Sequence, residues 1–466
     1  MEKYFKIKEH GSTMRTEIVA GFTTFFTMAY VILVNPDILS NGNEQIFNGV
    51  FIATCLSAAV GTFLMAFWAN LPFAQAPGMG LNAFFAFTIM PTMSKIVARE
   101  LDVIESYQLA LVLVFISGLL FITITAFGIR EAIIEAIPAN VKHAISGGIG
   151  LFIAYLGLQN AKIVVPHPVT QVSLVNFKGL LNPETYHDTM GAVIAIIGLL
   201  IITALTARKI KGSIFIGILV TTVIAYLPFL NYMQLPEKIS LHLGKQFADF
   251  AEVSLLKMDV GGLFGGGSFL QTLSTVIVIV ISFSLVDMFD TIGALLGTAK
   301  KANLLDENGN MPSMKKALMC DAIATTTGAC LGSSTVTTYV ESSAGIAEGG
   351  RTGLTAAVTG AMFVLALVIG PFVTLIPSVA TAPSLIFVGA LMMSGVKEID
   401  FSEICESVPA FLTVVMMPLT YSIANGIAFG LISYCIIKLV SGKAKETKPL
   451  TWILSLLFII KFMMAP

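Results

Sequence analysis

The stretch FAQAPGMGLNAFFAFTIM (residues 73–90) is apolar enough to lie inside a membrane, yet it cannot form one continuous helix. Pro77 has no backbone N–H to donate, and Gly78 and Gly80 are poor helix formers. The stretch GSSTVTTYVESSAGIAEGG (332–350) is interrupted differently, because its β-branched, hydroxyl-rich run SSTVTT favours an extended backbone. Irregular backbone at membrane depth is tolerated only where protein or a water-filled cavity satisfies its polar groups. The two breaks are therefore expected to lie in the interior of a membrane protein, against other segments or a water-filled cavity.

The composition is typical of a chain that spans a lipid bilayer. Of 466 residues, 56% are hydrophobic and 12% are charged, whereas soluble domains average about 25% charged residues. The mean hydropathy is +0.86. Apolar runs of about 20 residues span a bilayer as helices, and here the runs are continuous rather than alternating, which excludes a β-barrel. The sequence predicts an all-α polytopic membrane protein.

Several other classes of function have no support in the sequence. A net charge of −1 gives no argument for nucleic acid as a partner. The five cysteines lie in apolar contexts without CxxC spacing, as buried free thiols do. The five histidines are scattered near loops and helix ends, so we expect neither a metal site nor another cofactor. No removable signal peptide is expected at the polar N-terminus.

Each half of the chain offers seven apolar elements, and a segment of mixed charge, 230–267, which we expect to be a loop, separates the halves. The expected elements are 17–35, 46–69, 73–92, 106–127, 140–158, 188–207 and 211–229, then 268–298, 314–331, 332–348, 351–375, 382–396, 405–422 and 424–441. A last stretch, 449–464, is short and contains Lys461, and the sequence leaves open whether it spans the membrane.

The distribution of Lys and Arg predicts the orientation, since both favour the cytoplasmic side. Basic residues gather before the first element and after the sixth, eighth and fourteenth: Lys3, Lys6, Lys8, Arg15, Arg208, Lys209, Lys211, Lys300, Lys301, Lys315, Lys316, Lys443, Lys445 and Lys448. The connections that follow an even number of membrane crossings lie on the same side as the N-terminus. The basic residues there predict a cytoplasmic N-terminus in the cell membrane. Seven is odd, so the second half enters from the opposite face, as in an inverted repeat.

The two halves also share their internal spacing. The first element begins near 17 and its half breaks near 77, whereas the second half begins near 270 and breaks near 333. Paired interruptions at matching positions of two halves are the best sequence indication of a transporter's substrate site. Half-helices beginning near Gly80 and Val340 would direct free N–H groups, the positive ends of helix dipoles, to the middle of the membrane.

Polar residues lie at both breaks. Gln75 and Asn82 belong to the first, and Thr338 and Glu341 to the second. Ionisable residues inside a membrane are functional by default, so Glu341 is a candidate ligand of the substrate; its alternative is a place at the membrane surface. For Asn82 the alternative is a cap on its own half-helix. For Gln75 a structural role is the better interpretation.

The run SLVDMFDTIGALLG (284–297) places two acids in an apolar element. Asp287 and Asp290 are three residues apart, so they share one helix face. Carboxylates facing lipid are costly, so this face must look onto protein or a cavity. A carboxyl there that takes a proton on one side of the membrane and releases it on the other could couple transport to protons. The alternative is a structural pair bonded to neighbouring helices.

These segments resemble a known family. TTYVESSAG (337–345) is similar to the matching stretch of bacterial uracil permeases. QAPGMGLNAFFAF (75–87) and SLVDMFDTIGALLG together resemble the adenine/guanine/hypoxanthine branch of the nucleobase–cation symporter-2 (xanthine/uracil permease) family. The resemblance covers nearly the whole chain, in order and in spacing.

The resemblance implies a fold of fourteen transmembrane segments in two inverted repeats of seven, with a short strand and a half-helix in the third and tenth elements. It further implies core domains at 17–127 and 268–375 and gate domains at 140–229 and 382–441, with 449–464 as a C-terminal apolar stretch. The implied activity is proton-coupled uptake of purine bases, without enzymatic chemistry. A homodimer is one assembly that such a chain could form.

The resemblance also suggests site residues. Glu341 matches the glutamate that binds the base in the uracil permeases, and Asp290 matches their other acid. The purine branch carries both aspartates and an asparagine that matches Asn82. We therefore expect a binding set, which comprises Glu341, Asp290, Asn82, Val340, Phe84 and Thr338, with proton coupling at Asp287 and Asp290. Ala294, Val340 and Ser342 depart from the uracil permeases and favour a different base.

Three other functions compete with this prediction. An anion transporter of the same fold is opposed by acids at the site, which would repel its substrate. An intramembrane aspartyl protease needs two aspartates on different helices, whereas Asp287 and Asp290 lie on one. A passive channel would be excluded by accumulation of substrate against a gradient.

Overall fold

The computed structural model describes residues 2–128, 137–210, 212–233, 243–263, 269–302, 304, 311, 313–369 and 375–464. Within these ranges the chain is helical apart from four short strands and the connecting turns. The helices of the first half are α1 (Met14–Met28), α2 (Val31–Ser40), α3 (Glu44–Leu64), α4 (Met79–Phe84), α5 (Met90–Val97), α6 (Val103–Ala126), α8 (Ala139–Asn160), α9 (Pro183–Ala207) and α10 (Ser213–Ala225). Strand β1 (Gln75–Pro77) precedes α4, and β2 (Val164–His167) and β3 (Gln171–Leu174) form a hairpin after α8.

The second half continues in the same manner. Its helices are α11 (Leu243–Asp249), α12 (Val260–Leu263), α13 (Phe269–Ala302), α14 (Met314–Leu331), α15 (Ser342–Ala347), α16 (Gly353–Ala366), α18 (Ser378–Met392), α19 (Ile404–Leu419), α20 (Ile423–Val440) and α21 (Pro449–Met464). Strand β4 (Val336–Thr338) lies between α14 and α15.

Side-chain caps explain where several of the long helices begin. At α6, the Asp102 carboxylate accepts a hydrogen bond from the Glu105 backbone N–H at 2.7 Å, and the Glu105 carboxylate accepts one from Asp102 in return. Asn43 and Asn182 accept hydrogen bonds from the first turns of α3 and α9. These caps satisfy N–H groups of the first turn, for which the helix has no backbone carbonyl as acceptor.

In the part of the chain that the structure describes, six helical stretches are long and apolar enough to cross a membrane: Met14–Ser40, Glu44–Ala69, Val103–Ala126, Ala139–Asn160, Pro183–Ala207 and Ser378–Glu398. Several shorter apolar helices accompany them, among them α16, α19 and α20. The prediction of an all-α, multi-pass membrane protein is therefore confirmed.

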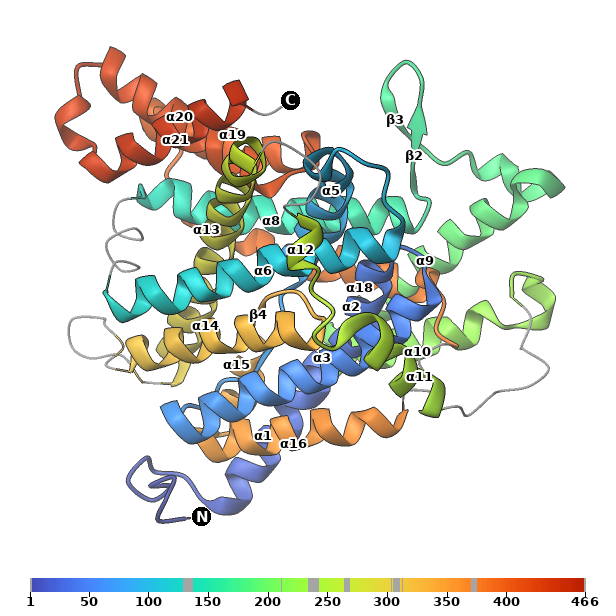
Figure 1. The fold of residues 1–466 in the computed structure, drawn as a ribbon. Coiled ribbons are helices and arrows are strands. Elements are labelled where there is room, and N and C mark those ends of the chain that lie inside the picture. Colours follow the sequence, from blue (N-terminus) through green and yellow to red (C-terminus); the bar gives the residue numbers. More distant parts are fainter. Residues whose placement is uncertain are drawn as a thin grey trace.

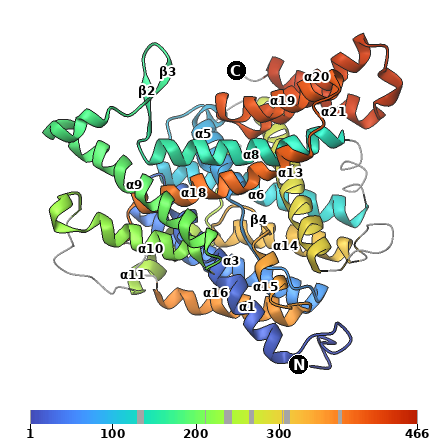
Figure 2. The same ribbon diagram turned by 180° about the vertical axis from the view of Figure 1, so that it is seen from behind.

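The helices pack in two groups, which can be followed in Figures 1 and 2. In the first, α1 and α3 pack on α16, and α6 and α3 pack on α14. In the second, α18 packs on α8, α9 and α10, and α19 packs on α8 and α20. Each group therefore combines helices from both halves of the chain.

Connections gather at two opposite ends of the molecule. The β2–β3 hairpin and α11 lie at the right of Figure 1, and the end of α6, the start of α14 and the α20–α21 turn lie at the left. At the left end the Lys315 Nζ donates to the Ala126 carbonyl at 3.3 Å. We refer to the end that carries β2 and β3 as the hairpin end.

The connection 230–267, expected to be a loop, is partly helical. It contains α11, a π-helical turn (Phe250–Ser254) and α12. This segment is held against α3 and α6, because the Asn48 Nδ2 donates to Asp249 at 2.7 Å and the Gln108 Nε2 donates to the Val253 carbonyl at 3.1 Å. Tertiary contacts, rather than a strong local pattern, decide its structure.

The C-terminal stretch 449–464 forms α21, which packs on α20. The Ser455 hydroxyl donates to the Leu431 carbonyl at 3.0 Å and lies 3.1 Å from the Cys435 sulfur. Small polar side chains buried between two apolar helices are a usual device for joining them in a membrane.

Candidate functional site

The two breaks in the chain lie side by side. Strands β1 and β4 pair antiparallel, with Gln75 opposite Thr338 and Pro77 opposite Val336. The Gly78 N–H donates to the Thr335 carbonyl at 3.2 Å, which extends the pairing beyond the strands. The strands are buried on both faces. Two extended segments, each too short to be stable alone, thus satisfy each other's backbone groups inside the protein.

A short helix follows each strand. Helix α4 begins at Met79 after Gly78, and α15 begins at Ser342 after Glu341. Neither helix receives a hydrogen bond from a side chain at its N-cap. The alternative role for Asn82, a cap on its own helix, is therefore wrong: Asn82 is the fourth residue of α4.

Glu341 is held by a tyrosine from the other half of the chain. The Tyr30 hydroxyl, between α1 and α2, donates to the Glu341 Oε1 at 2.8 Å. Tyr30 is 1% exposed, whereas Val340, the residue before Glu341, is 52% exposed. The carboxylate is thus fixed on one side by a buried hydroxyl and lies beside a residue that is accessible from outside the protein.

Three of the predicted contact residues are engaged within the protein. Asn82 is fully buried, and its side-chain oxygen accepts a hydrogen bond from the Ser334 hydroxyl. The Phe84 ring is 2% exposed and stacks on Phe283, with ring centres 5.8 Å apart. The Thr338 hydroxyl accepts a hydrogen bond from the Gln75 amide at 3.3 Å. A structural role for Gln75, as expected, agrees with this bond.

The two aspartates lie on α13, which packs against β4 and α15. Asp287 is fully buried. Asp290 follows one turn later, and its side chain lies outside the part of the structure that is described. Helix α13, which carries both predicted acids, therefore packs against the elements on either side of Glu341.

A third acid, which the sequence analysis missed, lies in the same region. The Thr291 hydroxyl, next to Asp290, donates to the Asp321 carboxylate at 2.9 Å and lies 2.7 Å from the Thr337 hydroxyl. Asp321 is fully buried in α14. The network joins α13, α14 and β4. An acid in an apolar segment was the signal used for Asp287, and it would have identified Asp321 as well.

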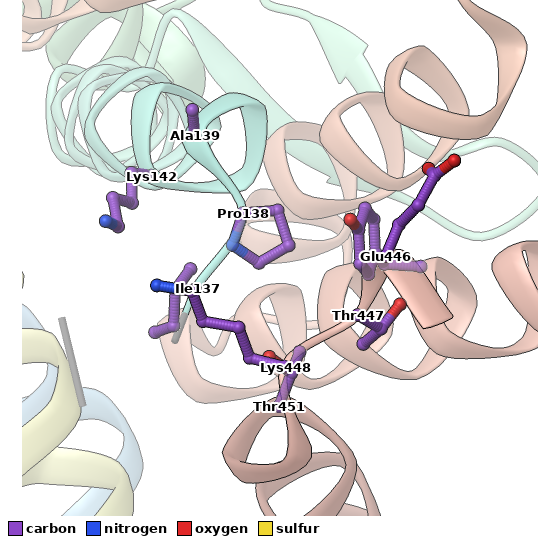
Figure 3. A pocket seen from close by; sticks show the side chains of 9 residues that line it. Ile137, Pro138, Ala139, Lys142, Glu446, Thr447, Lys448 and Thr451 are labelled. Carbon is purple, nitrogen blue, oxygen red and sulfur yellow. The ribbon is translucent and has the colours of Figure 1, made fainter. Parts of the chain in front are cut away.

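A cavity of about 290 Å³ lies elsewhere, where α8 begins and α20 leads into α21 (Figure 3). Its lining includes Pro138, Lys142 and Lys448, and none of the residues predicted to bind substrate. Glu446, which also lines it, forms an ion pair with Lys438 at 2.8 Å. This cavity is separate from the two breaks. Among the described residues no group of three His, Cys, Asp or Glu side chains could hold a metal ion.

Comparison with known proteins places the chain among membrane permeases. The model described as the Permease family matches residues 15–429. The adenine permease AdeP of Escherichia coli (strain K12) is 40% identical over 461 residues, which cover 99% of this chain and 95% of that protein. The guanine/hypoxanthine permease PbuO of Bacillus subtilis (strain 168) is 40% identical over 467 residues, covering 98% of this chain and 99% of the permease.

Among solved structures, the transmembrane domain of the cyanobacterial bicarbonate transporter BicA has a similar fold. The TM-score is 0.63 at 13% sequence identity, over 88% of this chain and 97% of that domain. At this identity the likeness concerns the fold alone.

Proposed function

Because this chain belongs to the Permease family, we propose that it imports purine nucleobases together with protons across the cell membrane. Membership of that family makes the chain a transporter and not an enzyme, which removes the intramembrane protease from the alternatives. The substrate, the coupling ion and the direction of transport are the parts of the proposal that need support.

The observation that carries the substrate proposal is the position of Glu341. Its carboxylate is held by Tyr30 at 2.8 Å beside the half-exposed Val340, directly before a helix. Purine bases are neutral, flat and rich in N–H groups, which a carboxylate accepts as charge-assisted hydrogen bonds. Relatives that match almost their full length are adenine and guanine/hypoxanthine permeases, and this supports purines over uracil.

For the architecture we propose fourteen segments in two inverted repeats. Support comes from the antiparallel pairing of β1 with β4, because repeats of opposite orientation bring equivalent strands together in that manner. The two packing groups of helices support core domains at 17–127 and 268–375 and gate domains at 140–229 and 382–441. Transport would then proceed as the core moves against the gate, exposing the site first to one side and then to the other.

For proton coupling we propose Asp287 and Asp290. Asp287 is fully buried on the helix that packs against the element of Glu341. A buried carboxyl that is ionised in one state of the transporter and protonated in another moves a proton with each cycle. The fold shared with BicA keeps an anion transporter as the second candidate, but acids at the site oppose an anionic substrate.

Uptake competition tests the substrate proposal. Radiolabelled hypoxanthine is offered to cells or proteoliposomes and challenged with unlabelled adenine, guanine, hypoxanthine, xanthine, uracil and bicarbonate. We expect competition by purines and none by uracil or bicarbonate. If the protein took up radiolabelled bicarbonate and unlabelled purines did not compete with that uptake, the anion transporter would replace the proposal.

The orientation gives a separate prediction. Cysteines introduced within 300–314 should be protected in intact cells from a membrane-impermeant thiol reagent, and cysteines within 235–260 should react, because basic residues crowd the former region. The same reagent applied to inverted vesicles should give the reverse pattern. Reaction of 300–314 from outside intact cells would contradict the cytoplasmic N-terminus.

Tyr30 provides a milder prediction. Tyr30→Phe removes the hydroxyl that donates to Glu341 and keeps the ring, so we expect purine affinity to change by several-fold, the scale of about 1 kcal/mol for one hydrogen bond. Equilibrium binding of radiolabelled purine to the purified protein measures it. Tyr186→Phe, which removes a hydroxyl that donates to the Leu230 carbonyl at the hairpin end, is the matched control. Equal effects of the two substitutions would remove Tyr30 from the site.

A further inference from the structure

Side-chain hydrogen bonds join the two packing groups of helices in the part of the chain that the structure describes. The Thr381 hydroxyl on α18 lies 2.8 Å from the Asp37 Oδ2 on α2. The Thr88 hydroxyl, on the π-helical turn after α4, donates to the Tyr421 carbonyl between α19 and α20 at 3.3 Å. Helix α2 and the turn after α4 belong to the proposed core. Helices α18, α19 and α20 belong to the proposed gate, which therefore begins at Ser378, where α18 begins, and not at 382.

Both contacts lie at the hairpin end. Tyr226 at the end of α10 donates to the Leu375 carbonyl just before α18, at 3.1 Å. Tyr421 donates through its hydroxyl to Gln159 at 2.9 Å, and Gln159 lies at the end of α8, just before the β2–β3 hairpin. The hydrogen bonds between core and gate are therefore concentrated on one side of the molecule.

The Asp37–Thr381 contact is well placed to be strong. Thr381 is 2% exposed and lies in the first turn of α18, whose N-cap Pro377 provides no side-chain cap. A carboxylate there accepts a hydrogen bond from the hydroxyl and faces the positive end of a helix dipole. The Thr381 hydroxyl also lies 2.9 Å from the Ser378 carbonyl, which remains as its acceptor when Asp37 moves away.

The second contact includes a strained residue. Tyr421 has a left-handed backbone, with φ +53°, which a bulky side chain adopts only when its surroundings impose it. Its ring packs edge-on against Phe87 of the core and Phe152 of the gate, with ring centres 5.9 and 5.5 Å apart. The turn between α19 and α20 is thereby pressed against the segment that follows α4.

We propose that Asp37 and Thr381, supported by Thr88 and Tyr421, form a latch that closes the hairpin end of the transporter. The latch breaks whenever the substrate site opens towards that end, because the two helices it joins belong to parts that must separate. This inference rests on the proposed transport by a core moving against a gate. Asp37 and Thr381 then set the balance between the two states without touching the purine.

Thiol labelling of Val340→Cys tests the latch, because Val340 borders the site and is half exposed. A membrane-impermeant reagent is applied from each side in turn, in proteoliposomes, with the Val340-containing chain as the blank for native cysteines. Thr381→Val removes the hydroxyl at nearly constant volume. We expect labelling from the hairpin end to rise roughly tenfold, the scale of one hydrogen bond to a charged group, and labelling from the other end to fall.

The controls separate a latch from general damage. Thr381→Ser keeps the hydroxyl and should label like the parent. Thr413→Val makes the same change at a fully buried threonine whose hydroxyl donates to its own helix at 2.8 Å, and should also leave labelling unchanged. If Thr381→Val does not accumulate in the membrane, Asp37→Ala, which removes the acceptor, gives the same measurement.

Asp37→Ala should raise labelling as much as Thr381→Val, and the double variant should add little to either alone, since both remove one interaction. Unchanged labelling in folded Thr381→Val, or fully additive effects of the two substitutions, would overturn the latch. The labelling needs no purine. A chain that binds no purine but shows the coupled labelling would contradict the proposed substrate and keep the latch.

Discussion

Glu341→Gln should weaken purine binding by roughly 10- to 150-fold, the scale of about 1.5–3 kcal/mol for a lost charge-assisted hydrogen bond to a buried ligand. Glutamine has nearly the same shape, so the Tyr30 hydroxyl, now 2.8 Å from the Glu341 carboxylate, keeps an acceptor there. The purine N–H groups lose the negative charge they would meet. Equilibrium binding of radiolabelled hypoxanthine to purified protein measures the change.

Glu348→Gln is the matched control. Glu348 is an exposed glutamate at the C-terminal cap of α15, the helix that Glu341 precedes. The same loss of charge one short helix away should change binding little, because water screens an exposed group. Binding by Glu341→Gln that equals the parent, or equal losses in both variants, would remove Glu341 from the site.

Asp287→Asn and Asp290→Asn should separate transport into its two parts. We expect Asp287→Asn to keep measurable purine binding and exchange, but to lose accumulation driven by a pH gradient. An amide cannot take up and release the proton that the proposed cycle moves. Asp290→Asn should lose binding itself, because Asp290 matches the second acid of the uracil permeases that the chain resembles, and we propose it as a contact of the base. Counterflow and pH-driven uptake in proteoliposomes distinguish the two outcomes.

The two aspartates are three residues apart on α13, so their titrations are coupled and a single assignment depends on this pair of variants. Asp188→Asn, at an exposed acid of α9, is the control for loss of an acid outside the site. Full pH-driven accumulation by Asp287→Asn would exclude it as the carrier. If Asp287→Asn lost binding and Asp290→Asn lost only accumulation, the two roles would be exchanged.

The sequence alone predicted the class of protein and the positions of its unusual segments. Long apolar runs can be stable only across a bilayer or in a large core, so they predicted the helices directly. Proline, glycine and β-branched residues predicted the breaks that the structure has at β1–α4 and β4–α15. Charged groups in apolar runs are costly wherever they lie, so Asp287 and Glu341 were identified without knowledge of their neighbours.

Where local pattern was weak, prediction was less complete. The connection 230–267 was expected to be a loop, but contacts with α3 and α6 give it helical turns. Asn82 was left between a ligand and a cap on its own helix, and the structure excludes the cap, because α4 begins after Gly78 and the Asn82 side-chain oxygen accepts a hydrogen bond from Ser334. Asp321 was not identified, although its carboxylate joins α14 to α13 through Thr291.

Which groups meet was decided by the tertiary structure. Gln75 pairs with Thr338, Tyr30 donates to Glu341, and the partners in each pair are 263 and 311 residues apart. Asp37 and Thr381 are likewise brought together across 344 residues. The free-energy cost of burying a residue depends on its own chemistry, so this cost can be predicted from the local sequence. The partner that offsets this cost depends on how distant helices pack, because inside the membrane every polar group must find its hydrogen bond within the protein.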